Sequence, residues 1–172
     1  MRPLSWSAAA ALTLFACGPP TPVDEERRPA PDLALQRVDG NGQFALADHK
    51  GTVLLVDLWA TWCGPCLAEL PHLQKLSDSY DPKEFLMIGI VLESGGREEI
   101  QEFIRKQGIS YPNLMGEDGT KEAFGSFLGY PTKYLIDKDG VIVKKYFGVV
   151  GDRLSEDLEL FLRTGALAPA GE

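Results

Sequence analysis

The residues best suited to chemistry in this sequence are two cysteines three positions apart, Cys63 and Cys66. They follow an apolar run, residues 52–58, and precede a stretch with helical character, residues 67–80, so they lie at a predicted junction between a strand and a helix. Two thiols at this spacing can form a disulfide and exchange it with another molecule. The pair therefore predicts a redox site.

The two cysteines are expected to have different roles because a helix begins beside them. If the helix starts at or just after Cys63, its sulfur lies over unpaired backbone N–H groups and the positive end of the helix dipole, which favour the thiolate. Cys63 is therefore predicted to be the acidic, exposed nucleophile. Cys66 is predicted to be the resolving thiol, and Pro65 suits the first helical turn because its missing N–H would be unpaired there.

A cysteine pair at this spacing also has interpretations without catalysis. It could supply half of a zinc site, but only Cys17, His49 and His72 remain to complete the ligands. It could form a structural disulfide, although so short a loop would restrict the unfolded chain little. The flanking strand and helix favour redox catalysis, with no metal ion and no cofactor other than the disulfide itself.

The wider motif resembles the thioredoxin superfamily. Residues 56–66 read Val-Asp-Leu-Trp-Ala-Thr-Trp-Cys-Gly-Pro-Cys, and Pro71 and a Gly-Tyr-Pro-Thr stretch at residues 129–132 follow. Residues 66–71, Cys-Leu-Ala-Glu-Leu-Pro, resemble the extracytoplasmic, membrane-anchored TlpA/ResA type. The resemblance spans residues 31–163 and implies an α/β thioredoxin fold, in which helices flank a mixed central sheet, with an N-terminal hairpin and a helical insert.

Two acidic residues acquire roles through this resemblance. Asp57 interrupts an apolar strand, and the matching thioredoxin residue is the general base that exchanges a proton with the resolving thiol, here Cys66. Glu69 shares a helical face with Cys66 and matches a glutamate linked to thiol acidity in the TlpA/ResA type. Two carboxylates in a partly buried pocket raise each other's pKa, so we expect one to stay protonated near neutral pH. The alternatives are a solvent-facing Asp57 and an exposed Glu69.

The substrate-binding surface is expected around the cysteine pair. Pro131 resembles the cis-proline that faces the cysteines in this superfamily, the alternative being a trans turn. Tyr130 would then bind an extended peptide through its main chain, with its ring exposed. Trp62 is expected to cover the surface beside the pair. Gly64 and Pro65 form the dipeptide of thioredoxin itself, whose reduction potential is about −270 mV, and this favours a reductant.

The N-terminal residues predict export and a lipid anchor. Residues 1–16 have the pattern of a signal peptide, and residues 14–17 resemble a bacterial lipoprotein box in which Cys17 carries the lipid. The alternative is an ordinary secretory signal that leaves Cys17 as a free thiol. Residues 17–31 are rich in proline and predict a stiff tether. Gly18 stands where an aspartate would favour the inner membrane, so we expect the periplasmic side of the outer membrane.

The net charge of −8 limits the partners. Nucleic-acid phosphates would repel such a chain, and anionic lipids would not attract it, so any membrane attachment is expected through Cys17.

The elements that must position the site fall in one domain, residues 32–165, followed by a tail, residues 166–172. Asp152 is predicted to cap the last helix, and Pro71 to kink the first. Hydrophobic periodicity predicts strands at residues 33–38, 43–46, 52–58, 85–92, 133–136 and 141–147, and helices at residues 67–80, 97–107, 120–127 and 153–163.

Together these patterns predict a monomeric, exported thiol–disulfide oxidoreductase that reduces disulfides in other exported proteins. The resemblance implies a membrane thiol carrier as electron donor and apocytochrome c as the leading substrate. A disulfide oxidase or isomerase on the same fold stays open. So does a peroxide-reducing protein, which the adjacent resolving cysteine disfavours. A copper-binding assembly module that uses the two thiols as ligands is the last interpretation, and the lack of a well-placed third ligand disfavours it.

Overall fold

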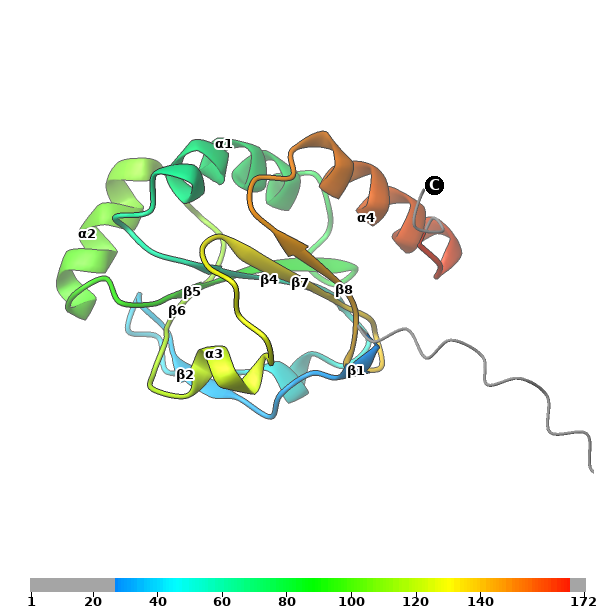
Figure 1. The fold of residues 1–172 in the computed structure, drawn as a ribbon, viewed down its shortest axis with the longest axis horizontal. Helices are drawn as coiled ribbons and strands as arrows, with labels where there is room; N and C mark the ends of the chain where they lie inside the picture. Colours follow the sequence, from blue (N-terminus) through cyan, green and yellow to red (C-terminus); the bar gives the residue numbers. More distant parts are fainter. Residues whose placement is uncertain (1–26, 168–172) are drawn as a thin grey trace, which may run out of the picture.

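A six-stranded mixed sheet forms the centre of the protein in the computed structural model, which describes residues 27–167 (Figure 1). β4 runs parallel to β5 and β5 to β6, whereas the other neighbouring pairs are antiparallel. The mixed central sheet that the sequence predicts is thus confirmed. In spatial order the strands are β1 (Arg28–Pro29), β8 (Val141–Phe147), β7 (Thr132–Ile136), β4 (Val53–Trp59), β5 (Phe85–Val91) and β6 (Asn113–Met115).

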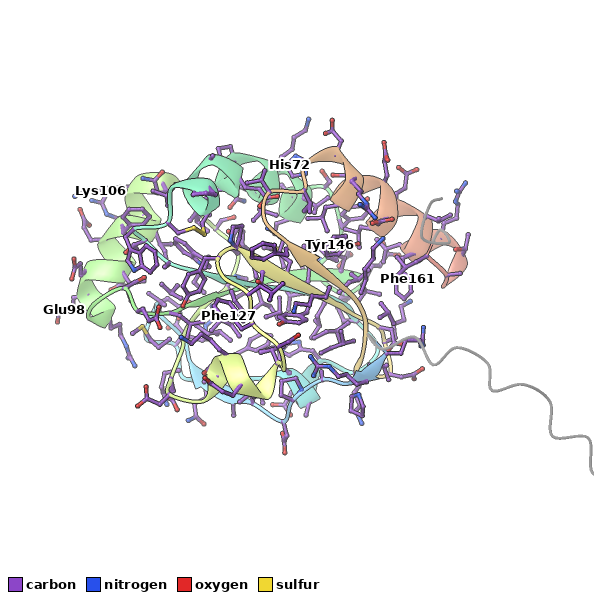
Figure 2. The ribbon with its side chains drawn as sticks, in the orientation of Figure 1. His72, Glu98, Lys106, Phe127, Tyr146 and Phe161 are labelled. Carbon is purple, nitrogen blue, oxygen red and sulfur yellow. A yellow bond between two sulfur atoms is a disulfide. The ribbon has the colours of Figure 1, made fainter. Side chains whose placement is uncertain are left out.

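Different elements cover the two faces of this sheet (Figure 1). One face packs against α1 (Gly64–Asp78), α2 (Arg97–Gln107) and α4 (Asp152–Thr164). The other packs against the predicted N-terminal hairpin, β2 (Ala34–Gln36) with β3 (Gln43–Ala45), the 3-10 helix η1 (Leu46–His49) and the short α3 (Thr120–Ala123). Tyr146 and Phe161 lie in the core between β8 and α4, while Glu98 and Lys106 point away from α2 into solvent (Figure 2).

All seven residues of β4 are buried because strands and helices surround it on every side. This is the environment that its nearly continuous apolar run predicts. Asp57 is the one charged residue in the strand, so its carboxyl group is carried into the core. The helix after β4 places Cys63 and Cys66 at the carboxyl end of the same strand.

The edge strand β1 corrects the predicted start of the domain. Arg28 and Pro29 pair with β8, and the Ala30 N–H donates to the Gly140 carbonyl at 2.9 Å. The Arg28 guanidinium also donates to the carbonyl of Phe124. Proline is tolerated here because an edge strand leaves one row of N–H groups unpaired. Residues 28 and 29 therefore belong to the sheet, whereas the predicted tether extends to residue 31. Residues 1–26, with Cys17 and Gly18, lie outside the described residues.

Other differences from the predicted elements are local. The strand β6 is missing from the prediction because its three residues are too short to show a periodicity. Asp152 does not cap α4: the N-cap is Gly151, at φ 52°, and Asp152 is the first helical residue. The helix α3 ends at Ala123 because Gly125 turns the chain with φ 85°. Pro71 lies inside α1, which continues to Asp78. In residues 27–167 no helix is both long and apolar enough to cross a membrane.

Gly89 in β5 lets a buried polar contact form behind the active site. The indole N–H of Trp59 donates to Oδ1 of Asn113 at 3.0 Å. A Cβ atom on Gly89 would lie 2.1 Å from that oxygen and 2.8 Å from the indole nitrogen. Both distances are shorter than atoms can approach, and both partners are buried.

Gly89→Ala is therefore expected to lower the free energy of unfolding by about 2–3 kcal/mol, because the added methyl group breaks the contact between Trp59 and Asn113. Urea unfolding followed by tryptophan fluorescence measures the loss. Gly96→Ala is the matched control, since a Cβ there meets nothing within 4 Å, and it is expected to cost about 0.5 kcal/mol. Equal stability of the two variants would contradict the prediction.

Candidate active site

Cys63 and Cys66 form a disulfide at the start of α1, with their Cα atoms 5.3 Å apart. Cys63 is the N-cap residue, and its sulfur accepts a hydrogen bond from the Cys66 backbone N–H at 3.2 Å. Pro65 lies in the first turn, as predicted. The sulfur of Cys63 thus faces a helix N-terminus, where a backbone donor and the helix dipole favour a thiolate.

The predicted exposure of Cys63 is wrong in this oxidised state. Its exposed fraction is 4%, because its sulfur turns inward over the end of α1 to bond Cys66, which is itself buried. The neighbouring residues Trp62, Gly64 and Pro65 are the exposed ones. A partner must therefore approach the disulfide across these three residues.

Trp62 and Tyr130 form an aromatic surface next to the disulfide. Trp62 is 62% exposed, and its ring meets that of Tyr130 edge to face, with centroids 5.6 Å apart. Tyr130 is half-buried rather than fully exposed because its ring also packs against that of Phe127, with centroids 4.9 Å apart. Trp62 thus has the predicted position on the surface, while Tyr130 is held on two sides.

Glu93 bonds to both residues of this aromatic surface, and it was not predicted from the sequence. Its carbonyl accepts the indole N–H of Trp62 at 2.7 Å, and its carboxylate accepts the hydroxyl of Tyr130 at 3.1 Å and the ammonium of Lys121 at 2.6 Å. Hydrogen bonds from Lys121 and Tyr130 lower the pKa of Glu93. Glu93 has a backbone φ of 51°, which is unusual for a residue other than glycine. Its position directly after the β5 region was the only sequence signal.

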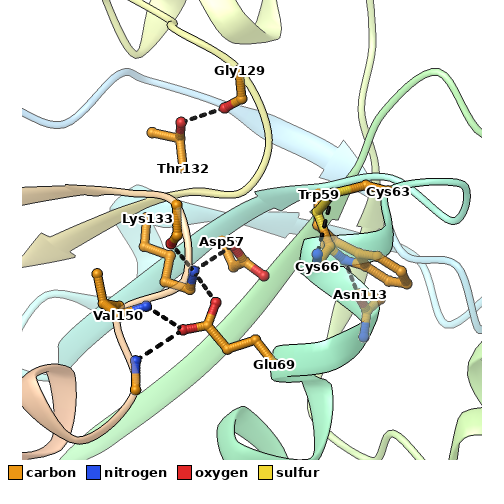
Figure 3. A network of polar contacts seen from close by, with 12 residues as sticks. Asp57, Trp59, Cys63, Cys66, Glu69, Asn113, Gly129, Thr132, Lys133 and Val150 are labelled. Atoms are coloured by element: carbon orange, nitrogen blue, oxygen red, sulfur yellow. Dashed lines mark hydrogen bonds and ion pairs between the residues drawn. A yellow bond between two sulfur atoms is a disulfide. The ribbon is translucent and has the colours of Figure 1, made fainter.

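The peptide bond between Tyr130 and Pro131 is cis, which confirms the prediction from the Gly-Tyr-Pro-Thr motif. The hydroxyl of Thr132 donates to the Gly129 carbonyl at 2.6 Å (Figure 3). The Pro131 carbonyl accepts the Gly148 N–H at 2.9 Å. Large apolar side chains are exposed around this bond, namely those of Leu128, of Phe147 at the end of β8 and of Val149. Exposed apolar side chains that gather near a reactive group are typical of a surface that binds another protein.

A buried charged cluster lies under the site and joins Asp57, Glu69 and Lys133 (Figure 3). Their exposed fractions are 1%, 2% and 0%, so the alternatives of a solvent-facing Asp57 and an exposed Glu69 are wrong. The Lys133 ammonium lies 2.5 Å from Oε2 of Glu69 and 3.8 Å from Oδ1 of Asp57. Lys133 was missed because a single lysine in a strand usually faces solvent. Its only signal is that the three residues after it in β7 are all aromatic or aliphatic.

Burial raises the pKa of Asp57 to about 6, the Lys133 ammonium opposes the rise, and the Glu69 carboxylate adds to it. The sequence predicts a raised carboxyl pKa from two neighbouring acids, and the direction is right. The main cause is burial, however, and Lys133 was not foreseen. Asp57 is therefore mostly ionised at pH 7 and takes up a proton as the pH falls toward 6, so the expectation that one carboxyl stays protonated near neutral pH is not met.

The two histidines are each engaged away from the cysteine pair. The His49 ring stacks on Phe44, with centroids 4.1 Å apart, and His72 Nε2 lies 3.2 Å from the hydroxyl of Ser155. Within residues 27–167, no group of three or more His, Cys, Asp or Glu residues is arranged to hold a metal ion.

Taken together, a disulfide at a helix N-terminus, a cis-proline loop and an exposed aromatic surface on a thioredoxin fold define a thiol–disulfide oxidoreductase. The chain belongs to the AhpC/TSA family, whose model matches residues 27–145.

Individual relatives agree with this class. Thiol-disulfide oxidoreductase ResA of Bacillus cereus (strain ZK / E33L) is 31% identical over 136 residues, which cover 78% of this chain and 75% of the relative. Sporulation thiol-disulfide oxidoreductase A of Bacillus subtilis (strain 168) is 24% identical, over 84% of this chain and 90% of the relative. A solved thiol:disulfide interchange protein of the thioredoxin family from Chlorobium tepidum TLS is 28% identical with a TM-score of 0.71, covering 81% of this chain and 99% of that chain. The resemblance to the TlpA/ResA type is thereby confirmed.

Proposed function

We propose that this oxidoreductase is a reductant of disulfides in exported proteins and works on the extracytoplasmic side of a bacterial membrane. The observation that carries the proposal is the position of the Cys63 sulfur at the N-terminus of α1, beside the exposed Trp62. The Gly64-Pro65 dipeptide supports a reducing direction, as in thioredoxin. A lipid on Cys17 would hold the protein at the membrane.

The reaction follows from the two thiols of the reduced protein. The Cys63 thiolate attacks one sulfur of the substrate disulfide, that disulfide breaks, and the departing substrate sulfur takes up a proton. The Cys66 thiol then gives its proton to Asp57, and its sulfur attacks Cys63 in the mixed disulfide. The second substrate sulfur leaves as a thiolate, so two electrons pass from the protein to the substrate and the Cys63–Cys66 disulfide forms.

The substrate that suits this surface is an extended, partly apolar peptide that contains a disulfide. The main chain beside Pro131 can pair with such a peptide, and Leu128, Phe147 and Val149 can contact its apolar side chains. The Cys-x-x-Cys-His segment of apocytochrome c has this form, and we propose it as the first substrate. A membrane thiol carrier would then re-reduce the Cys63–Cys66 disulfide.

The reduction potential of the Cys63–Cys66 pair tests the direction of electron flow. We expect a value near −270 mV when the protein is equilibrated with glutathione or dithiothreitol buffers and the two states are separated by thiol alkylation. A value near −120 mV would instead make the protein a disulfide donor.

Cell fractionation of the natural chain and of Cys17→Ala tests the anchor: the variant is expected to leave the membrane fraction. Recovery of the natural chain with inner-membrane markers would contradict placement at the outer membrane.

A further inference from the structure

Lys133 is a fully buried lysine on β7, two residues after Pro131. Its ammonium contacts Glu69 at 2.5 Å and Asp57 at 3.8 Å, and it donates to the Gly148 carbonyl at 3.3 Å. An ammonium group removed from water is costly unless opposite charges and hydrogen bonds compensate it. The contacts of Lys133 therefore show which of its two acidic neighbours supplies that compensation.

The two acids are bonded very differently. Glu69 uses both oxygens: Oε2 accepts from Lys133, while Oε1 accepts the backbone N–H groups of Val150 at 3.0 Å and Gly151 at 3.4 Å. Asp57 is only within ion-pair distance of Lys133, too far for a hydrogen bond. Among the residues that the structure describes, Oδ1 of Asp57 is a buried oxygen without a hydrogen-bond partner. Both oxygens of Glu69 are thus occupied by hydrogen bonds, whereas Asp57 keeps an oxygen that can take a proton.

We propose that Lys133 gives the two carboxyl groups different roles. It holds Glu69 in an ion pair, so Asp57 is the carboxyl group that gains and loses a proton beneath the disulfide. Lys133 is then a positioning residue, which acts on the cysteines only through Asp57. The proposal rests on the proposed function in one respect, namely that Asp57 accepts the proton of Cys66.

The charges around Asp57 determine the signs of the expected effects. Lys133 faces it from β7 and Glu69 from α1, and the buried hydroxyl of Tyr111, just before β6, is close enough for Asp57 to raise its pKa. The pKa of Asp57 is raised by burial and by Glu69 and lowered by Lys133. Removing the charge of Lys133 must therefore raise this pKa, whereas removing the charge of Glu69 must lower it.

The direct test is the titration of the Asp57 carboxyl carbon by 13C NMR in the oxidised full chain, assigned with Asp57→Asn. Lys133→Met is expected to move the midpoint to higher pH by about one unit, and Glu69→Gln to lower pH by a similar amount. The double variant, Lys133→Met with Glu69→Gln, is expected to have a midpoint between those of the two single variants. A merely structural role would give both single variants the same shift or none, and either result would overturn the proposal.

Two further comparisons keep the test decisive. Lys144→Met removes another ion pair, that with Asp157 at 2.7 Å, and should leave the Asp57 midpoint unchanged because Lys144 does not act on Asp57. If Lys133→Met does not fold, the double variant takes its place, because it buries neither the Lys133 ammonium nor the Glu69 carboxylate. Its midpoint must then lie above that of Glu69→Gln, and a midpoint equal to it would overturn the proposal.

The rate of mixed-disulfide resolution against pH separates this inference from the proposed function. If the midpoint of Asp57 moves as expected and the resolution rate follows it, both stand. If the midpoint moves but the rate does not follow, the different roles that Lys133 gives to Glu69 and Asp57 still stand. Asp57 is then not the acceptor of the Cys66 proton.

Discussion

Cys66→Ser is expected to accumulate a covalent complex between Cys63 and its substrate, whereas Cys63→Ser is expected to lose disulfide reduction by at least about a thousandfold. The difference follows from the position of the two sulfurs at the start of α1. The sulfur of Cys63 faces the helix N-terminus and receives the Cys66 N–H, so it is the thiolate that attacks. The resolving sulfur cannot replace it, because Cys66 lies deeper in the first turn.

The measurement starts from protein that has been reduced with dithiothreitol and then desalted, because remaining dithiothreitol would cleave the mixed disulfide. The protein is mixed with an oxidised peptide that has a Cys-x-x-Cys-His segment, and the complex is detected by non-reducing gel and mass spectrometry. Cys17→Ser is the matched control, since it removes the third cysteine of the chain and is expected to reduce the peptide at the natural rate. A complex that forms through Cys66 in the Cys63→Ser protein would reverse the assignment of the two thiols.

Asp57→Asn is expected to make the folded protein more stable at neutral pH while slowing catalysis. The pKa of Asp57 is raised to about 6 in the fold from an ordinary value of 3.8. Between these values the folded state binds more protons than the unfolded state, so this group costs stability as the pH rises. The cost is absent below about pH 3, is complete above about pH 7 and amounts to roughly 3 kcal/mol. An asparagine at the same position does not titrate.

Urea unfolding of the oxidised protein at several pH values between 4 and 7.5 checks this expectation. The difference in unfolding free energy between Asp57→Asn and the natural chain should grow steadily over that range, in favour of the variant. Asp39→Asn provides a control of opposite sign, because hydrogen bonds from Arg37 lower the pKa of the exposed Asp39. A stability difference that does not change with pH would mean that Asp57 is not a titrating buried acid. In the proposed mechanism, the natural residue thus lowers stability but supplies a proton acceptor.

Much of this protein could be predicted because its strongest signals are local. The buried strand β4 and the helix that carries the cysteines each depend on a few neighbouring residues, whereas the cis-proline was predicted from the resemblance of its motif to the thioredoxin superfamily. The continuous apolar run of β4 and the glycine after α2, at φ 68°, are examples in which sequence and structure agree. Local signals of this kind survive folding because the same residues that bias the backbone also pack in the core.

The features that could not be predicted depend on contacts between distant residues. Lys133 reads as an ordinary strand lysine until β7 lies beside β4 and α1, which bring Asp57 and Glu69 to it. Glu93 gains its role only when the loop after β5 meets Trp62 and Tyr130. The strand β1 forms because β8 offers it an edge, and its own sequence has no strand periodicity. The burial of Cys63 likewise depends on the direction in which its sulfur turns.

The pairing of β1 with β8 places the first described residues at the end of β8 that lies away from the active site. Residues 28 and 29 lie against the first residues of β8, whereas Phe147, the last residue of β8, lies opposite Thr132 beside the cis-proline. The length of β8 separates these two ends by about 20 Å. If the proposed lipid on Cys17 holds the protein at a membrane, the cysteines lie at the end of the domain that faces away from that membrane. Reduction by a thiol carrier in the same membrane would then require the domain to rotate, and the length of the chain before Arg27 would limit the rate of that rotation.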